Sequence, residues 1–271
     1  MTELSTSAPI LAVRGLRVAF GFGADATVVV ENLSYDLPSN RTLAIVGESG
    51  SGKSVSALAL LGLVRHLGGR IKSGTIGFRS EVLSGVVDLA HADEAQLRTI
   101  RGNEIAMIFQ EPMTSLNPVF TIGSQIVEAI TLHQHIGRNQ AWKRALELMD
   151  LVRLPNGEHT LRSYPHQLSG GMRQRAMIAM ALSCRPRVLV ADEPTTALDV
   201  TIQAQILTII RDLQREFETA VIFISHDMGV VAEMADDVLV MRNGCAVEFA
   251  PVTQIFAAPT ADYTKALLHA V

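Results

Sequence analysis

Residues 47–54, GESGSGKS, decide the fold of the chain. They match the pattern G-x-x-x-x-G-K-[ST], which predicts a phosphate-binding loop where it joins a strand to a helix. The short apolar run at residues 42–47 predicts the strand, and residues 54–64, which are apolar nearly all round, predict a buried helix. The glycines allow backbone angles that a Cβ would forbid, so several amide groups can converge on one phosphate at the helix N-terminus.

Each part of this loop has an expected role in holding a nucleotide. Lys53 supplies a positive charge for the β- and γ-phosphate oxygens, and the Ser54 hydroxyl is a ligand for Mg²⁺. We expect the whole stretch to contact the nucleotide: Gly47, Glu48, Ser49, Gly50, Ser51, Gly52, Lys53, Ser54 and Val55.

The remaining apolar pattern predicts an α/β fold with a mostly parallel sheet. Three more short apolar runs, at residues 104–109, 187–191 and 220–225, predict buried strands. Residues 172–184 and 200–216 predict helices. The second helix has one apolar face, formed by Ile202, Ile206, Ile209, Ile210 and Leu213. The Asn243-Gly244 pair, between two apolar-rich runs, predicts a hairpin.

Two regions do not follow a simple alternation of strand and helix. Residues 11–20, 28–37 and 74–89 predict an antiparallel β layer, and residues 121–164 predict a helical insert between two core strands. A stripe at helical spacing in the insert, Ile122, Ile126 and Ile130, is either the insert's own core or a face for a partner. We expect a single domain over residues 8–271, with a helical subdomain at about residues 112–165.

Composition excludes several classes of protein. The chain has 271 residues, 48% of them hydrophobic, so it can bury a substantial core. Its net charge is −4 and its basic residues are not clustered, which disfavours a nucleic acid as a partner. The longest apolar runs fall short of the roughly 18 residues that a membrane span needs. Cys184 and Cys245 have no neighbours at metal-ligand spacing, so neither a zinc site nor an iron–sulfur cluster is expected.

A pair of acids completes the predicted metal site. Residues 188–192, VLVAD, form an apolar strand that ends in Asp192, and an acid at this place beside a phosphate-binding loop holds Mg²⁺. Glu193 follows directly, and a second carboxylate here can polarise an attacking water molecule. The alternative is a pair of solvated acids at a strand end.

Residues 168–174, LSGGMRQ, narrow the choice among nucleotide-binding proteins. Phosphate-binding loops occur in GTPases, kinases, helicases and transporters, so the loop alone defines no function. The LSGG core with its following Gln, placed before a predicted helix, resembles the signature motif of the ATP-binding cassette (ABC) ATPases. Ser169 can also be an ordinary N-cap, and both interpretations hold together because a capped helix still presents free amide groups. The guanine motif N-K-x-D is absent, which argues against a GTPase.

Four other residues fit the pattern of that family. Gln110 lies where the family has a glutamine that contacts Mg²⁺ and the water, and His226 where it has a histidine that contacts the γ-phosphate. Residues 196–199, TALD, match the family's D-loop, although Asp199 can equally be the N-cap of the next helix. Phe20 ends the first strand, where the family places an aromatic ring against adenine; an ordinary core residue is the alternative.

The resemblance implies ATP and Mg²⁺ as cofactors. It assigns catalysis to Lys53, Gln110, Glu193 and His226, and it assigns Mg²⁺ to Ser54, Gln110 and Asp192. In this family two cassettes, identical or related, pair head-to-tail. The signature would therefore act on the partner's nucleotide through Ser169, Gly170 and Gly171. The resemblance also implies that Asp199 lies at a nucleotide.

The chain is similar to the peptide and nickel uptake branch of bacterial importers in three longer segments, residues 109–118, 164–174 and 192–201. This branch includes the glutathione, dipeptide and oligopeptide importers. That likeness implies ATP-driven import through two membrane-spanning permease subunits, with a periplasmic or surface solute-binding protein acting indirectly. It places the chain at the cytoplasmic face of the inner membrane, as a peripheral subunit. A soluble ABC ATPase that is not coupled to transport is the alternative. Because some members carry two cassettes, the sequence is expected to be a short member or a fragment.

Overall fold

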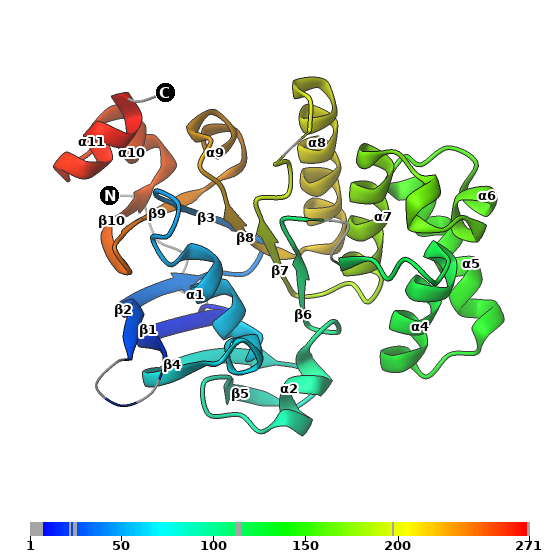
Figure 1. Cartoon of the computed structure of the whole chain (residues 1–271), viewed down its shortest axis with the longest axis horizontal. Coiled ribbons are helices and arrows are strands. Elements are labelled where there is room, and N and C mark those ends of the chain that lie inside the picture. Colours follow the sequence, from blue (N-terminus) through cyan, green and yellow to red (C-terminus); the bar gives the residue numbers. More distant parts are fainter. Residues whose placement is uncertain (1–7, 22, 24–25, 112–114, 197, 270–271) are drawn as a thin grey trace. The chain divides into compact units, whose positions relative to one another are not determined.

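The computed structural model describes residues 8–21, 23, 26–111, 115–196 and 198–269. The parts of our predictions that fall on residues 112–114, on Ala197 and on residues 270–271 lie outside the described residues. The chain divides into two compact units, Met1–Arg98 with Ile222–Val271, and Thr99–Val221. Figure 1 labels the helices and strands of both units.

The first unit contains a four-stranded antiparallel sheet in the order β2-β1-β4-β5. Its strands are β1 (Leu11–Phe20), β2 (Thr27–Leu37), β4 (Gly69–Ser80) and β5 (Gly85–Asp88). Val13 lies opposite Tyr35 on one side and Ile76 on the other, and all three side chains are buried. The predicted antiparallel layer is confirmed, and residues 74–89 fall in its strands β4 and β5.

The same unit holds strands of a second sheet, in the order β10-β9-β3-β8. These are β3 (Thr42–Val46), β8 (Ala220–Ile224, which crosses the boundary between the units), β9 (Asp237–Arg242) and β10 (Cys245–Pro251). β3 and β9 are parallel, with Ala44 opposite Val238, and both of these residues are buried. Their continuous apolar character is what a strand covered on both faces requires.

The turn between β9 and β10 is the hairpin that Asn243-Gly244 predicts. Both residues have positive φ angles, 49° and 80°, as a two-residue type I′ turn requires. The helices of this unit follow the strands: α1 (Lys53–Leu60), α2 (Glu94–Ile100, whose end lies in the second unit), α9 (Met228–Met234), α10 (Val252–Ala257) and α11 (Asp262–His269).

The helix predicted over residues 54–64 ends earlier than expected. α1 stops at Leu60, and the chain continues as a 3-10 helix, Leu63–Leu67. The cause is Gly62, which has a left-handed φ of 66°. Glycine reaches this conformation without a steric cost, so it ends a helix readily.

In the second unit the strand order is β8-β7-β6, and β6 (Ile105–Ile108) and β7 (Val188–Asp192) are parallel. The helices α7 (Gly170–Leu182) and α8 (Val200–Phe217) also belong to this unit. The apolar face predicted for α8 is buried apart from Ile202, which is half-buried at the start of the helix; the buried residues are Ile206, Leu207, Ile209, Ile210 and Leu213. The α/β class with a mostly parallel sheet is confirmed.

The helical part of this unit consists of α4 (Ile122–Gln134), α5 (Arg138–Leu151), α6 (Gly157–Arg162) and a 3-10 helix, Pro165–Gln167. Ile122, Ile126 and Ile130 of α4 are at most 1% exposed. This stripe is therefore core, and any partner must use other side chains. Among the helices of the described residues, none has the length and apolar character needed to span a bilayer.

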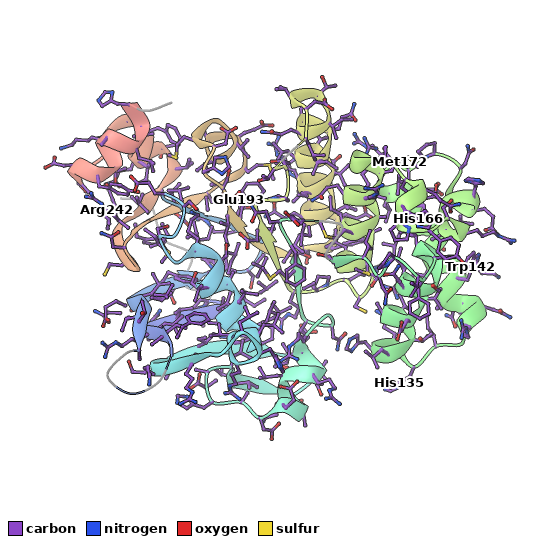
Figure 2. All side chains as sticks on the ribbon, in the orientation of Figure 1. His135, Trp142, His166, Met172, Glu193 and Arg242 are labelled. Atoms are coloured by element: carbon purple, nitrogen blue, oxygen red, sulfur yellow. The ribbon has the colours of Figure 1, made fainter. Side chains whose placement is uncertain are left out.

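Close packing between α4 and α5 gives a first prediction. A Cβ on Gly123 of α4 would lie 2.6 Å from the ring of Trp142, which Figure 2 labels on α5, and 2.8 Å from the Leu161 carbonyl oxygen. Gly123→Ala should therefore lower the free energy of unfolding by about 1–3 kcal/mol through overpacking. Urea denaturation measures the change.

Gly137→Ala is the matched control. No atom lies within 4 Å of a Cβ at this position, and its φ is −69°. Because Gly137 is the N-cap of α5, where alanine is a poorer cap than glycine, the free energy of unfolding should fall by less than about 1 kcal/mol. Equal stability of the Gly123 and Gly137 variants would contradict the packing argument.

Candidate nucleotide-binding site

The loop at residues 47–54 joins β3 to α1, as predicted, and its glycines take conformations that other residues avoid. Gly47, Gly50 and Gly52 have φ angles of 148°, 80° and 97°. A Cβ on Gly47 would lie 2.1 Å from the Met241 carbonyl oxygen, and one on Gly52 would lie 2.7 Å from the Val29 carbonyl oxygen. Both positions require glycine because the loop backbone packs directly on neighbouring strands.

Lys53 is almost fully buried within this loop, at 6% exposure. Its ammonium Nζ donates hydrogen bonds to the carbonyl oxygens of Gly47, at 2.8 Å, and Glu48, at 2.9 Å. A buried charge is costly unless it is paired and hydrogen-bonded. The two carbonyl groups hold the charge inside the curve of the loop, where it can attract an anion.

The Ser51 hydroxyl gives a separate indication of a ligand. It is buried and has no hydrogen-bond partner among the residues that the structure describes. Buried polar groups are usually satisfied, so an unpaired one at a glycine-rich turn fits a bound polar group. The buried cation, the open glycine backbone and this hydroxyl together fit an anionic phosphate.

Two contacts that sequence reasoning missed support the loop from outside. The Gly244 N–H, in the β9–β10 turn, donates to the Ser51 carbonyl oxygen at 3.0 Å. The Glu48 N–H donates to the Tyr263 hydroxyl of α11 at 3.2 Å. The Asn243-Gly244 pair signalled a hairpin but not its place against the loop, and no sequence signal identified Tyr263.

Phe20 is half-buried at the end of β1. Its ring packs against the backbone of β4, because a Cβ on Gly69 would lie 2.8 Å from the ring's Cζ atom. The packing on Gly69 agrees with a structural residue, and the part of the side chain that remains exposed leaves surface for a ligand. Both interpretations of Phe20 therefore stay open.

His226 follows β8 in the first unit and is exposed. A tight turn fixes the chain here, because the Asp227 N–H donates to the Ser225 hydroxyl oxygen at 3.0 Å. Asp227 then caps α9 by accepting from the Gly229 and Val230 N–H groups. The polar residues around His226 are thus used to hold the turn.

The second unit contains the predicted acids. Asp192 ends β7 and is only 6% exposed. Glu193, labelled in Figure 2, has a left-handed φ of 45°, a costly conformation for a residue with a long side chain. Its Oε2 atom accepts hydrogen bonds from Gln110 Nε2, at 3.0 Å, and from the Thr196 hydroxyl, at 2.9 Å. The structure therefore brings Gln110 and Glu193 together, and it adds a contact from Thr196, which the sequence placed in the D-loop motif but not against Glu193.

The signature motif begins α7. The Ser169 hydroxyl oxygen accepts a hydrogen bond from the Met172 N–H at 3.3 Å, so Ser169 is the N-cap. No atom lies within 4 Å of a Cβ at Gly170, and one at Gly171 would lie 3.0 Å from the Ile202 side chain. Gln174 is buried and its Nε2 donates to the Pro194 carbonyl oxygen, next to the acids.

A pocket of about 530 Å³ lies at this helix start. The signature glycines and Asp199 both line it, with Arg175 beside them. Asp199 is also the N-cap of α8, because its Oδ1 atom accepts from the Ile202 N–H at 3.0 Å. Capping by Ser169 and by Asp199 is thus observed, and it leaves both residues at the wall of an open pocket.

These features define a P-loop nucleotide-binding protein: the loop's glycines, the buried Lys53 and an acid at the end of a core strand. Residues 30–196 match the family model described as ABC transporter, and the chain belongs to this family.

Curated proteins that are similar to this chain include glutathione import ATP-binding proteins. The GsiA protein of Pectobacterium atrosepticum is 59% identical over 262 residues, which cover 97% of this chain and 42% of that protein. GsiA of Escherichia coli K12 is 58% identical with the same coverage. The chain thus spans about two fifths of the length of the curated relatives that it matches.

Solved structures share the fold. The dimeric ATP-binding cassette MJ0796, in a post-hydrolysis state bound to ADP and Pi, superposes with a TM-score of 0.76 at 23% identity, covering 89% of this chain and 98% of that one. The cbiO1 protein of Clostridium perfringens gives a TM-score of 0.75 at 24% identity, covering 93% and 92%.

The capping role of Ser169 gives a second prediction. Ser169→Ala removes the oxygen that caps α7 and should lower the free energy of unfolding by about 1 kcal/mol. Ser169→Asn keeps a capping oxygen and should restore most of that loss. Denaturant unfolding of the two variants measures both effects, and an equal loss in both would contradict the capping role.

Proposed function

We propose that the chain is the ATP-hydrolysing subunit of an ABC importer that takes up peptides, with glutathione as the first solute to test. The buried Lys53 in its glycine loop is the observation that carries ATP binding. The likeness to the GsiA proteins supports glutathione as a solute. The proposed site works at the cytoplasmic face of the inner membrane, and no nucleic acid takes part.

We propose a single nucleotide-binding domain over residues 8–271 with a helical subdomain at about residues 112–165, and the following roles for its residues at ATP. Residues 47–55 hold the phosphates and Phe20 contacts adenine. Mg²⁺ prefers oxygen ligands, and the hydroxyl of Ser54, the carboxylate of Asp192 and the amide oxygen of Gln110 supply them. When bound, the ion neutralises charge on the phosphate oxygens.

Glu193 is the proposed group that takes the proton of the attacking water, and His226 the group that contacts the γ-phosphate. The hydrogen bonds from Gln110 and Thr196 end on a single oxygen of Glu193, Oε2. These two hydrogen bonds hold the Glu193 carboxylate in a fixed position, as a group that orients an attacking water requires. The left-handed backbone at Glu193 helps to aim the carboxylate, and such strain is typical of functional positions.

A second cassette is the proposed partner, identical or related, arranged head-to-tail. The pocket at the start of α7 supports this, because it is open and lined by the signature residues and Asp199. The N-terminus of α7 carries unpaired amide groups and the positive end of the helix dipole, and both favour a phosphate. In the proposed dimer, Ser169, Gly170 and Gly171 complete the partner's site.

The proposed contact with two membrane-spanning permease subunits uses the outer surface of the helical part. Val119, Phe120 and Leu132 expose 71%, 51% and 64% of their surface there. The Gln125 side chain holds the loop before α4 by accepting from the Asn117 N–H and donating to the Asn117 and Phe120 carbonyl oxygens. Rigid presentation of exposed apolar side chains suits a docking site for a helix. A solute-binding protein acts through those subunits and does not touch this chain.

Glu193→Gln tests the proposed chemistry. The variant keeps the shape of the side chain, so ATP binding should survive, while hydrolysis should fall by about 10²–10⁴-fold. The ATP that remains should also hold two chains together. Phosphate release measures the rate, and size-exclusion chromatography with and without ATP measures the dimer.

Glu216→Gln on the exposed side of α8 is the control, and it should hydrolyse ATP at the wild-type rate. A Glu193→Gln rate within a few-fold of wild type would remove Glu193 from its proposed role. A wild-type chain that neither binds nor hydrolyses ATP would overturn the proposed function.

Charged substitutions at the exposed Val119 and Phe120, in the proposed docking site for the permease subunits, test whether the chain serves an importer or is a soluble ABC ATPase. Val119→Asp and Phe120→Asp should leave hydrolysis by the isolated protein unchanged, while uptake of glutathione by cells that express the complete transporter should fall at least tenfold. Val86→Asp, at a 72% exposed position of β5, is the matched control and should not affect uptake. If hydrolysis and uptake fall together, the segment before α4 that contains Val119 and Phe120 has a structural role only. If uptake never changes, a soluble ABC ATPase that is not coupled to transport is the better proposal.

A further inference from the structure

Helix α11 reaches the phosphate-binding loop through one side chain. The Tyr263 hydroxyl accepts a hydrogen bond from the Glu48 N–H at 3.2 Å, although the two residues are 215 positions apart. Nothing in the motifs of the nucleotide site includes this helix. The contact therefore indicates that α11 has a role in holding the phosphate-binding loop.

The peptide group between Gly47 and Glu48 connects the Tyr263 contact to Lys53. A peptide group is planar, so its N–H and C=O ends cannot rotate independently. The N–H end is the Glu48 amide, which Tyr263 holds, and the C=O end is the Gly47 carbonyl, which accepts from Lys53 Nζ at 2.8 Å. Tyr263 thus fixes the orientation of the same peptide plane that anchors the buried ammonium group.

Two contacts hold the Tyr263 ring in place. The Arg242 guanidinium, at the end of β9 and labelled in Figure 2, lies 4.7 Å from the ring centroid. Tyr263 packs with Leu267 and Leu268 of α11 against the buried core around β3 and β9. Both contacts use the ring and the helix, and neither uses the hydroxyl group, which remains available to the loop.

Glu248 of β10 fixes the start of α11. Its carboxylate accepts hydrogen bonds from the Thr260 N–H and hydroxyl, each at 2.8 Å, and from the Ala261 N–H at 3.0 Å. Burial alone raises the pKa of this carboxyl, but the hydrogen-bonding groups of Thr264, Thr260 and Ala261 outweigh it and lower the pKa to about 2. Near neutral pH the Glu248 carboxylate, which is the clamp at the start of α11, is therefore ionised.

We propose that Tyr263 is a positioning residue for nucleotide binding: through its hydroxyl, α11 holds the Gly47–Glu48 peptide plane and so prearranges Lys53 for phosphate. This inference rests on the proposed function. Without the hydroxyl the peptide plane can rotate, and the loop must be ordered when the nucleotide binds, which lowers affinity. Tyr263 does not touch the reacting atoms, so it alters binding and not the chemical step.

Tyr263→Phe tests the proposal because it removes only the hydroxyl and keeps the ring contacts with Arg242. The loss of one hydrogen bond, about 1 kcal/mol, corresponds to a nucleotide Kd about fivefold weaker. The KM for ATP should rise by a similar factor, while kcat at saturating ATP stays at the wild-type value. Fluorescent-nucleotide titration and steady-state hydrolysis measure these quantities.

Tyr35→Phe is the matched control. The Tyr35 hydroxyl is buried in the first unit and has no hydrogen-bond partner among the described residues, so the same chemical change there should leave the Kd unchanged. Failure of the wild-type chain to bind ATP would overturn the proposed function itself. If the wild-type chain binds and Tyr263→Phe binds equally well, the positioning role alone is wrong.

Double-mutant cycles distinguish an effect through the hydrogen bond between the Tyr263 hydroxyl and the Glu48 N–H from a general loss of structure. Glu48→Pro removes the donor N–H, so adding Tyr263→Phe to it should weaken binding no further. Glu248→Gln weakens the clamp at the start of α11 and should raise the Kd in the wild-type background but not in the Tyr263→Phe background. Additive effects in both cycles would show that α11 does not act through the Tyr263 hydroxyl and would overturn the proposal.

Discussion

A buried ammonium group held by its own loop is the constraint on which the rest of the structure depends. Lys53 has little access to water, and the Gly47 and Glu48 carbonyl groups compensate for that loss. In the same loop Gly47 adopts a φ of 148° and lies against the Met241 carbonyl, so this position requires glycine. The hairpin turn and α11 then hold the outside of the loop. The first unit thus holds one buried charge in place on a tightly packed backbone whose conformation requires glycine.

In the second unit, the polar groups of the candidate site have both a structural role and a proposed chemical role. Ser169 and Asp199 cap α7 and α8, yet both line an open pocket. Glu193 is held by Gln110 and Thr196 on a single oxygen. A hydroxyl or carboxylate oxygen has more than one lone pair, so capping does not exhaust the capacity of Ser169 and Asp199 to accept hydrogen bonds. A residue can therefore be necessary for the local fold and still serve a ligand, and stability and activity must be measured separately for each variant.

Sequence reasoning predicted the features that depend on residues close together in the chain. The phosphate-binding loop, the hairpin and the helix caps each follow from a spacing of a few residues, and the class of fold follows from the apolar runs. The prediction did not reach Thr196, Gln125 or Tyr263, because each acts through a contact that only the folded chain creates. For Ile122, Ile126 and Ile130, periodicity alone could not separate a core stripe from a partner face, and their burial settled the question.

The contact between α11 and the loop shows how a distant segment can set the properties of a local motif. The motif supplies the glycines and the lysine, but a glycine-rich loop is intrinsically free to adopt several conformations. Anchors outside the motif, Tyr263 and the Gly244 turn, remove that freedom before any nucleotide arrives. Affinity then depends on how well the loop is prearranged as well as on the groups that touch phosphate. Chains with the same motif can therefore differ in nucleotide affinity if they differ in the segment that follows β10.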